Sequence, residues 1–164
     1  MKYGRNERCH DRETAMWPRM AGAGSGAAGG LHPVFVYGSL LPGLENASLL
    51  WPFARSEPQQ GTVRGRLVIA DGYPALILPQ AGATSVRRVR GLWTLVDRAT
   101  LGRLDGLEEY FGPEETNDYE RVWVHDDDRN DLAGWVYIWP DDRGRPDAGS
   151  DWWPDARRTR RSEI

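Results

Sequence analysis

Short segments with strand-like patterns, separated by turn residues, fill the middle of the chain. Residues 61–70 alternate most clearly, with Val63, Gly65, Leu67 and Ile69 on one face and Thr62, Arg64, Arg66 and Val68 on the other. A period of two is typical of a strand. Apolar runs predict further strands over residues 34–37, 75–78 and 86–95. Residues 120–125 and 132–139 flank the acidic turn 126–131 and predict a hairpin.

Helical patterns are fewer than strand patterns. Residues 44–51 predict one or two helical turns, and Asp97 is a suitable N-cap for a helix running towards Gly106. Because the helices do not alternate regularly with the strands, a doubly wound parallel sheet is not expected. We predict an α+β fold, a small mixed β-barrel with flanking helices.

The length and composition of the chain predict one folded domain with an extension at each end. Its 164 residues include 40% hydrophobic ones, enough for a single core. Residues 1–31 are expected to form a disordered or linker-like extension, since 21–30 contain only alanine, glycine and one serine. Within this stretch, residues 24–29 match G-x-G-x-x-G but precede the first strand, which indicates a linker rather than a dinucleotide site. We expect the domain over 32–140 and a Pro/Asp/Arg-rich tail over 141–164.

Charge and cysteine content exclude several classes of protein. The net charge of -3 is spread along the chain, so a nucleic-acid partner is not expected. No apolar run reaches the roughly 18 residues that span a bilayer, and we expect no membrane partner. The single Cys9 cannot form an internal disulfide, and a cytoplasmic location is the expectation. The sequence does not indicate an oligomeric state.

Metal-binding patterns are incomplete. His10, His32 and His125 lie far apart and have no cysteine partner, which argues against a zinc site. Residues 126–137 begin like a calcium loop but carry Asp131 and Tyr137 where glycine and glutamate are needed, so we expect a solvated turn. We predict neither a metal nor an organic cofactor.

Eight tryptophans are many for this length. Those at 93, 123, 135 and 139 lie in strand patterns and are predicted to fill the core. Trp152 and Trp153 lie in the expected tail, and two exposed indoles usually need a covering surface. They are expected to dock on the domain itself or in a dimer.

Glu108 is the first candidate for catalysis. If the helix from Asp97 continues past Gly106, Leu101, Leu104 and Glu108 share one helical face, and Glu108 points inward while Glu109 does not. A carboxylate among apolar neighbours has a raised pKa, which suits a group that takes and gives a proton near neutral pH. The alternative is that the helix ends at Gly106 and both glutamates are solvated.

A second candidate site follows the first strand. In Tyr37, Gly38, Ser39 and Leu40, a glycine after a strand end lets successive backbone N–H groups converge and bind a carboxylate or an oxyanion. The alternative is an ordinary turn with Tyr37 in the core. Ser39 as a hydrolase nucleophile lacks the G-x-S-x-G elbow.

Together with three further segments, these motifs resemble the gamma-glutamylcyclotransferase-like family, which includes gamma-glutamylamine cyclotransferases and antibiotic-pathway enzymes. The segments occur in the family's order: Tyr37-Gly38-Ser39-Leu40 with Leu41-Pro42-Gly43, the strand around Gly65, Gly72-Tyr73-Pro74-Ala75, Leu104-Asp105-x-x-Glu108 and Tyr119-x-Arg121. The resemblance covers roughly residues 33–140.

This resemblance implies an enzyme that needs no cofactor and acts on a small gamma-glutamyl amine, amino acid or peptide. The substrate's α-amine attacks its own γ-carbonyl, giving 5-oxoproline and a free amine. By motif, Glu108 matches the catalytic carboxylate, and residues 37–40 match the loop that binds the glutamyl end. The chain departs from the family pattern at Glu109, where a small residue is common, and in the longer segment 111–118.

Two other functions remain open from the sequence. One is a non-catalytic relative that binds a small carboxylate-bearing metabolite in the same cavity. The other is an interaction module that uses the tryptophans and arginines of residues 141–164.

Overall fold

The computed structural model describes residues 30–113 and 115–162. Residues 1–29 of the expected N-terminal extension, including the glycine-rich segment 24–29, lie outside the described residues. The described elements, in chain order, are β1 (His32–Val36), η1 (Ala47–Leu49), η2 (Trp51–Phe53), β2 (Gln59–Arg64), β3 (Arg66–Ala70), β4 (Tyr73–Ile77), β5 (Arg88–Val96), α1 (Arg98–Leu107), β6 (Glu120–His125), β7 (Ala133–Ile138) and α2 (Trp153–Ser162).

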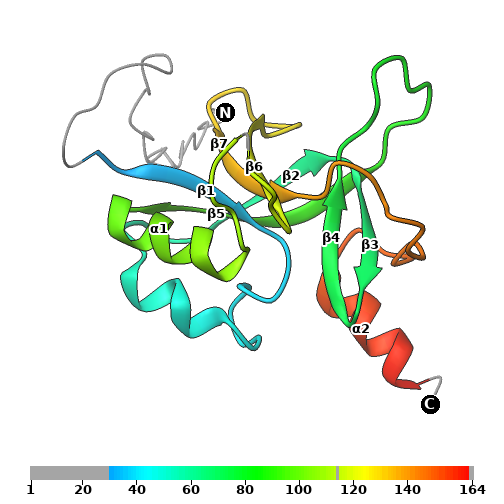
Figure 1. Ribbon diagram of the computed structural model, residues 1–164, viewed down its shortest axis with the longest axis horizontal. Coiled ribbons are helices and arrows are strands. Elements are labelled where there is room, and N and C mark those ends of the chain that lie inside the picture. The colour runs from blue at the N-terminus through cyan, green and yellow to red at the C-terminus, as the bar shows by residue number, and fades with distance from the viewer. Residues whose placement is uncertain (1–29, 114, 163–164) are drawn as a thin grey trace, which may run out of the picture.

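The strands form two sheets (Figure 1). The larger has the order β2-β5-β1-β7-β6, and the smaller is the antiparallel pair β3-β4. In the larger sheet β1 runs parallel to β7, whereas the other neighbours are antiparallel. The predicted hairpin is confirmed, because β6 and β7 pair from Glu120–Ile138 to His125–Ala133.

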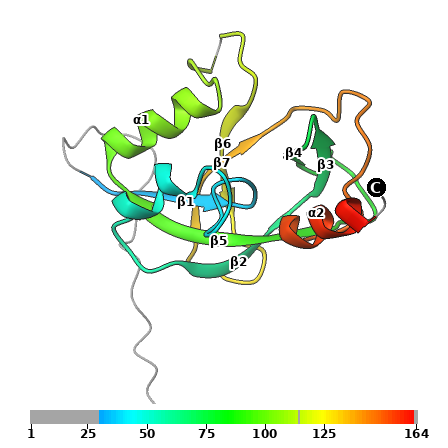
Figure 2. The ribbon, with the colours of Figure 1, turned by 90° about the horizontal axis from the view of Figure 1, so that it is seen from below.

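The larger sheet curls until its two edges meet without forming a closed ladder (Figure 2). Asp127, just after β6, donates its backbone N–H to the carbonyl of Thr62 in the opposite edge strand β2, at 2.8 Å. Trp139, just after β7, donates to the carbonyl of Leu76 in β4, at 3.0 Å. The predicted α+β fold is confirmed, and these bonds give the strands a partly closed, barrel-like arrangement.

The alternating stretch 61–70 is two strands rather than one continuous strand. Gly65 separates β2 from β3 with a φ of +150°, a region that side-chain-bearing residues rarely adopt. A Cβ at Gly65 would also lie 2.6 Å from the carbonyl oxygen of Ile77. The glycine therefore lets the chain leave the larger sheet and enter the smaller one, a change of direction that period-two patterning does not reveal.

Asp126, the first residue of the calcium-like turn, is buried, and the prediction of a fully solvated turn is wrong at this residue. Its carboxylate accepts hydrogen bonds from the backbone of Thr62 (2.9 Å), Asp128 (2.9 Å) and Arg129 (2.9 Å) and from Trp93 Nε1 (2.8 Å). Asp126 thus satisfies donors of the turn and of the core. Within residues 30–113 and 115–162, no group of three potential metal-ligating side chains occurs.

The four tryptophans predicted to fill the core do not all do so. Trp93 and Trp139 are buried, and Trp93 packs against Phe35 with ring centroids 5.0 Å apart. Trp135 is partly buried, whereas Trp123 is 40% exposed and packs edge-on against Trp135. Trp123 lies on β6, an edge strand of the larger sheet, so its strand periodicity did not imply burial.

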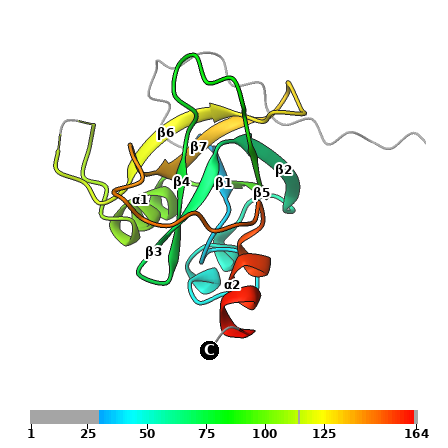
Figure 3. The ribbon, with the colours of Figure 1, turned by 90° about the vertical axis from the view of Figure 1, so that its right-hand side faces the viewer.

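The end of the described chain packs on the domain, although its composition predicted a tail. Pro146 accepts a backbone hydrogen bond from Ile69 (2.9 Å), and Ala148 donates one to Leu67 (2.9 Å). Helix α2 follows this segment (Figure 3). It buries Trp153, which is 2% exposed. Docking on the domain itself, one of the alternatives for the tryptophan pair, therefore accounts for Trp153. No helix among the described residues is both long and apolar enough to cross a membrane.

Replacing Trp153 with alanine should lower the free energy of unfolding by about 3 kcal/mol or more, since a large buried side chain is lost. Trp123→Ala is the matched control, because its side chain is partly in water, and it should cost less than about 1.5 kcal/mol. Urea denaturation followed by circular dichroism measures both. Equal losses would show that α2 does not contribute to the core as described.

Candidate active site

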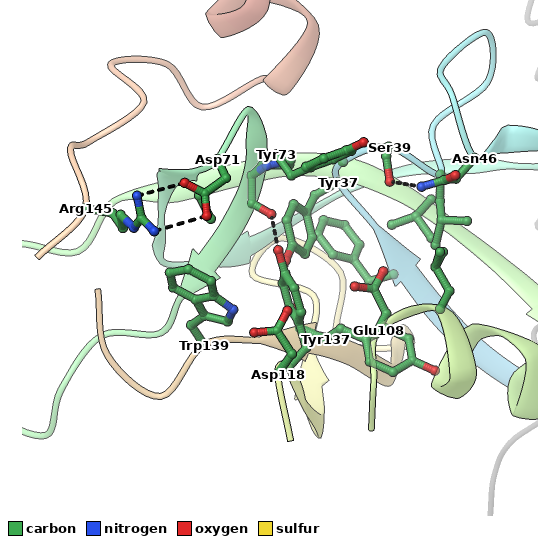
Figure 4. A pocket seen from close by; sticks show the side chains of 18 of the residues that line it. Tyr37, Ser39, Asn46, Asp71, Tyr73, Glu108, Asp118, Tyr137, Trp139 and Arg145 are labelled. Atoms are coloured by element: carbon green, nitrogen blue, oxygen red, sulfur yellow. Dashed lines mark hydrogen bonds and ion pairs between the residues drawn. The ribbon is translucent and has the colours of Figure 1, made fainter. Parts of the chain in front are cut away.

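A cavity of about 570 Å³ opens between the two sheets, beside the end of α1. Figure 4 shows Ser39 and Asn46 at one end and Asp71 and Arg145 at the opposite end. Its lining includes all five residues predicted for the site: Tyr37, Gly38, Ser39, Leu40 and Glu108. Motifs that are about 70 residues apart in the chain are therefore brought to one cavity.

Helix α1 positions Glu108. The helix begins after Asp97, whose side chain accepts a hydrogen bond from Thr100 N at 2.8 Å. The bonds from Thr100 lower the pKa of Asp97 to about 2. Leu101 and Leu104 are buried, and Glu108, at the C-cap, follows on the same face and lines the cavity. Glu109 has a φ of +51° and is exposed, so the two neighbouring glutamates face different surroundings.

Burial, together with the smaller effect of the nearby charge of Asp118, raises the pKa of Glu108 to about 7. Among the residues that the structure describes, none donates a hydrogen bond to this carboxylate. Ionised Glu108 thus lacks the donors that usually stabilise a buried charge. A carboxyl group that titrates near neutral pH can both accept and donate a proton.

Backbone hydrogen bonds from the segment that precedes β6 also hold Glu108 in place. Tyr119 N donates to the carbonyl of Glu108 (3.2 Å), and Asp118 N donates to that of Glu109 (3.2 Å). These bonds join the two ends of the segment 110–117, which we call the 110–117 loop. The longer segment 111–118 noted in the sequence therefore starts and ends close to Glu108.

An ion pair beneath the cavity connects α1 to the sheet. Arg121 Nη1 donates to both carboxylate oxygens of Asp105, at 2.9 and 2.7 Å, and Tyr137 Oη donates to Asp105 Oδ1 at 2.7 Å. The guanidinium also lies over the rings of Tyr110 and Trp135. Asp105 and Arg121 belong to the sequence motifs, but their role as a support for Glu108 was not predicted. The only sequence signal for this pairing was that Asp105 and Arg121, 16 residues apart, carry opposite charges.

The loop 37–40 lines the cavity. Leu41 N bonds Gly38 O (2.9 Å), and Trp51 Nε1 bonds Leu40 O (2.6 Å). Asn46 Nδ2 donates to Ser39 Oγ at 2.9 Å, fixing that side chain. The backbone N–H groups of residues 38–40 have no acceptor in the described part of the chain. They remain available to an anionic ligand, as the sequence pattern suggested.

Gly38 is required by the close approach of the smaller sheet. A Cβ at this position would lie 2.7 Å from Cγ of Pro74. The loop therefore lies against β4, which forms the opposite wall of the cavity.

Tyr37 joins the two sheets. Its buried hydroxyl donates to the carbonyl of Tyr137 (2.8 Å) and accepts from Leu76 N (3.1 Å). Burial raises the pKa of Tyr37 and of Tyr119, another cavity residue, so both stay protonated at neutral pH. The alternative reading of Tyr37 as a core residue is thus also correct, because its ring is buried while the residue lines the cavity.

Ion pairs flank the far end of the cavity. Asp71 pairs with Arg145 through both of its carboxylate oxygens, at 2.9 and 3.1 Å. Arg143 Nη1 donates to Asp118 Oδ1 at 3.0 Å, and its guanidinium lies over the Trp139 ring. The segment after β7 supplies both arginines, so residues that the sequence assigned to a tail line the cavity.

Residues 34–155 match the family model described as gamma-glutamyl cyclotransferase, AIG2-like. A curated relative, the gamma-L-glutamyl-butirosin B gamma-glutamyl cyclotransferase of Niallia circulans, is 36% identical over 122 residues, which cover 73% of this chain and 74% of the relative.

Solved structures with a similar fold include an AIG2-like protein from Mus musculus and a protein from Pyrococcus horikoshii. The mouse structure has a TM-score of 0.52 and 22% identity, over 67% of this chain and 78% of that one. The Pyrococcus structure has a TM-score of 0.56 and 18% identity, over 80% of this chain and 97% of that one. At these identities the likeness concerns the fold.

Glu108→Gln should make the unfolding free energy less dependent on pH. The folded pKa of about 7 lies above the ordinary 4.5, so stability is fully present below pH 4.5 and is lost as pH rises through 7. We expect the variant to gain up to about 3 kcal/mol relative to wild type between pH 5 and pH 8.5. Denaturant unfolding measures this gain, with Glu109→Gln as the control. Parallel stability curves for wild type and Glu108→Gln would contradict the raised pKa.

Proposed function

The chain belongs to the gamma-glutamyl cyclotransferase, AIG2-like family, and from this premise we propose that Glu108 and residues 37–40 form its active site. The enzyme is a gamma-glutamyl cyclotransferase that acts on small gamma-glutamyl substrates. The reaction is an intramolecular aminolysis. The α-amine attacks the γ-carbonyl, a C–N bond closes the ring, and the original amide C–N bond breaks, giving 5-oxoproline and a free amine.

The observation that carries the assignment of Glu108 is a carboxylate of raised pKa beside unpaired backbone donors in one cavity. Glu108 accepts a proton as the amine attacks and returns one to the departing nitrogen, so no net proton is consumed. Because nucleophile and electrophile are in one molecule, positioning and a matched proton carrier supply much of the rate.

The backbone N–H groups of residues 38–40 hold the glutamyl end. Residues 38–40 line the cavity and their N–H groups have no acceptor among the described residues, and a group of such donors can bind a carboxylate or a developing oxyanion. Asn46 and Trp51 keep the loop in this shape through their bonds to Ser39 and Leu40. The site is formed before the substrate arrives.

The departure at Glu109 does not disturb this proposal. Glu109 is exposed and turned by its positive φ, and the charge that acts on Glu108 is that of Asp118. The match to the family model and the curated cyclotransferase relative favour the catalytic reading over the non-catalytic one.

We also expect an N-terminal extension over 1–31, the domain over 32–140 and, after it, the segment 141–164, whose described part packs on the domain. From the sequence we expect a cytoplasmic location and no nucleic-acid partner, membrane partner, metal or cofactor. A small gamma-glutamyl substrate is the partner that the family indicates.

Glu108→Gln should reduce kcat for 5-oxoproline release by at least about 100-fold, because general acid–base catalysis contributes roughly that much or more. Glu109→Gln is the matched control and should retain kcat within about threefold, since a surface substitution changes little. Mass spectrometry of 5-oxoproline, from a panel of gamma-glutamyl amines, amino acids and peptides, measures both. Activity of Glu108→Gln equal to wild type would remove Glu108 from the mechanism.

The activity should rise with pH through an apparent pKa near 7, since Glu108 must be ionised to accept the proton. Asp118→Asn removes the neighbouring charge that raises this pKa, so the acidic midpoint of kcat/KM should move to lower pH. The profile is measured between pH 5 and pH 9 with one substrate. An unchanged midpoint would show that Asp118 does not tune Glu108.

A further inference from the structure

We propose that Asp118 selects substrates whose departing amine carries a second, positively charged group. This inference rests on the proposed function, because it takes Glu108 as the place where the amide bond breaks. It concerns the other end of the cavity, where the departing amine lies.

The two ends of the cavity carry different groups, which sets the direction in which a substrate lies. The backbone donors of residues 38–40 lie at the end marked by Ser39 and Asn46, and Arg145 and Asp71 lie at the opposite end (Figure 4). Asp118 lines the same cavity and is drawn between Glu108 and Trp139. With its glutamyl end at residues 38–40 and its reacting carbon at Glu108, a substrate extends its amine portion towards Asp118.

Asp118 has a carboxylate oxygen left for a ligand. Arg143 occupies Oδ1 at 3.0 Å and also donates to the backbone carbonyl of Asp118 at 2.7 Å. No described residue pairs with Oδ2. By contrast, the other aspartate of the cavity, Asp71, uses both carboxylate oxygens for Arg145.

The nearby charges favour a cation over an anion. The cavity lining carries the acids Asp71, Glu108 and Asp118 and the bases Arg143 and Arg145, and each arginine is already paired with an aspartate. Ionised Glu108 leaves the cavity with an excess of negative charge. An ammonium group near Asp118 Oδ2 therefore replaces water and gains a charge-assisted hydrogen bond.

The solvent exposure of Asp118 and Arg143 limits how strongly the cavity can prefer a cationic substrate. The side chains of Asp118 and Arg143 are 45% and 39% exposed, so a new ion pair there is partly screened. A contribution at the upper end of the range for exposed pairs corresponds to a preference of about fivefold.

Three gamma-glutamyl amides of similar length test the proposal: those of 1,4-diaminobutane, pentylamine and 4-aminobutyrate, whose far ends are cationic, neutral and anionic. We expect wild-type kcat/KM to fall in that order, with about a fivefold gap between the first two. Asp118→Asn, which retains an oxygen for Arg143, should bring the ratio of cationic to neutral substrate close to one. The ratio cancels the effect of the variant on Glu108, because both substrates share that step.

Asp71→Asn is the control, because it removes an equal charge from the lining of the same cavity. Both carboxylate oxygens of Asp71 are already paired with Arg145, so this variant should preserve the cationic preference within about twofold. Calorimetric binding of the three amides to Glu108→Gln is measured alongside, so that affinity is ranked even where no 5-oxoproline forms. A cation-first ranking lost only in Asp118→Asn supports the proposal. Equal ranking of the three, an anion-first ranking, or a cationic preference unchanged in Asp118→Asn would overturn it. Silence in the turnover assay with a cation-first binding order would overturn the proposed reaction alone.

Discussion

The buried hydroxyl of Tyr37 is the interaction on which the site depends. It joins β1 to a carbonyl of β7 and to a backbone N–H of β4, so one oxygen connects the larger sheet to the smaller. Both walls of the cavity are thereby held at a set separation, and the loop that follows Tyr37 enters the cavity between them. An unpaired buried hydroxyl or N–H is costly, which makes this three-way contact hard to rearrange.

A second support lies beneath α1. Asp105 binds Arg121 and Tyr137, and Tyr137 provides the carbonyl that receives Tyr37. Helix α1, which carries Asp105, and the loop that begins at Tyr37 are thus connected through these hydrogen bonds. The family motifs reflect this arrangement, because Tyr37, Asp105 and Arg121 stabilise the site from behind while Glu108 faces the cavity.

Local pattern predicted much of this molecule. The strands, the β6–β7 hairpin, α1 with its Asp97 cap and the inward face of Glu108 all follow from periodicity and capping. The departures arise from contacts between distant segments. Gly65 breaks a regular alternation because the carbonyl of Ile77 approaches it, and Trp123 is partly exposed on the edge strand β6. The polar composition of residues 141–162 predicted a tail, yet Trp153 is buried and Arg143 and Arg145 line the cavity. The average polarity of a segment does not reveal that one large side chain in it is buried.

Backbone hydrogen bonds fix the two ends of the 110–117 loop, so the position of Glu108 does not depend on the length of this loop. Glu108 and Tyr119 are tied by a backbone hydrogen bond, and the adjacent pair Glu109 and Asp118 by another, so insertions between them lengthen a loop whose ends do not move. Lengthening such a loop costs little conformational free energy. The position of Glu108 can therefore be kept while the loop that starts and ends beside it changes in length and sequence.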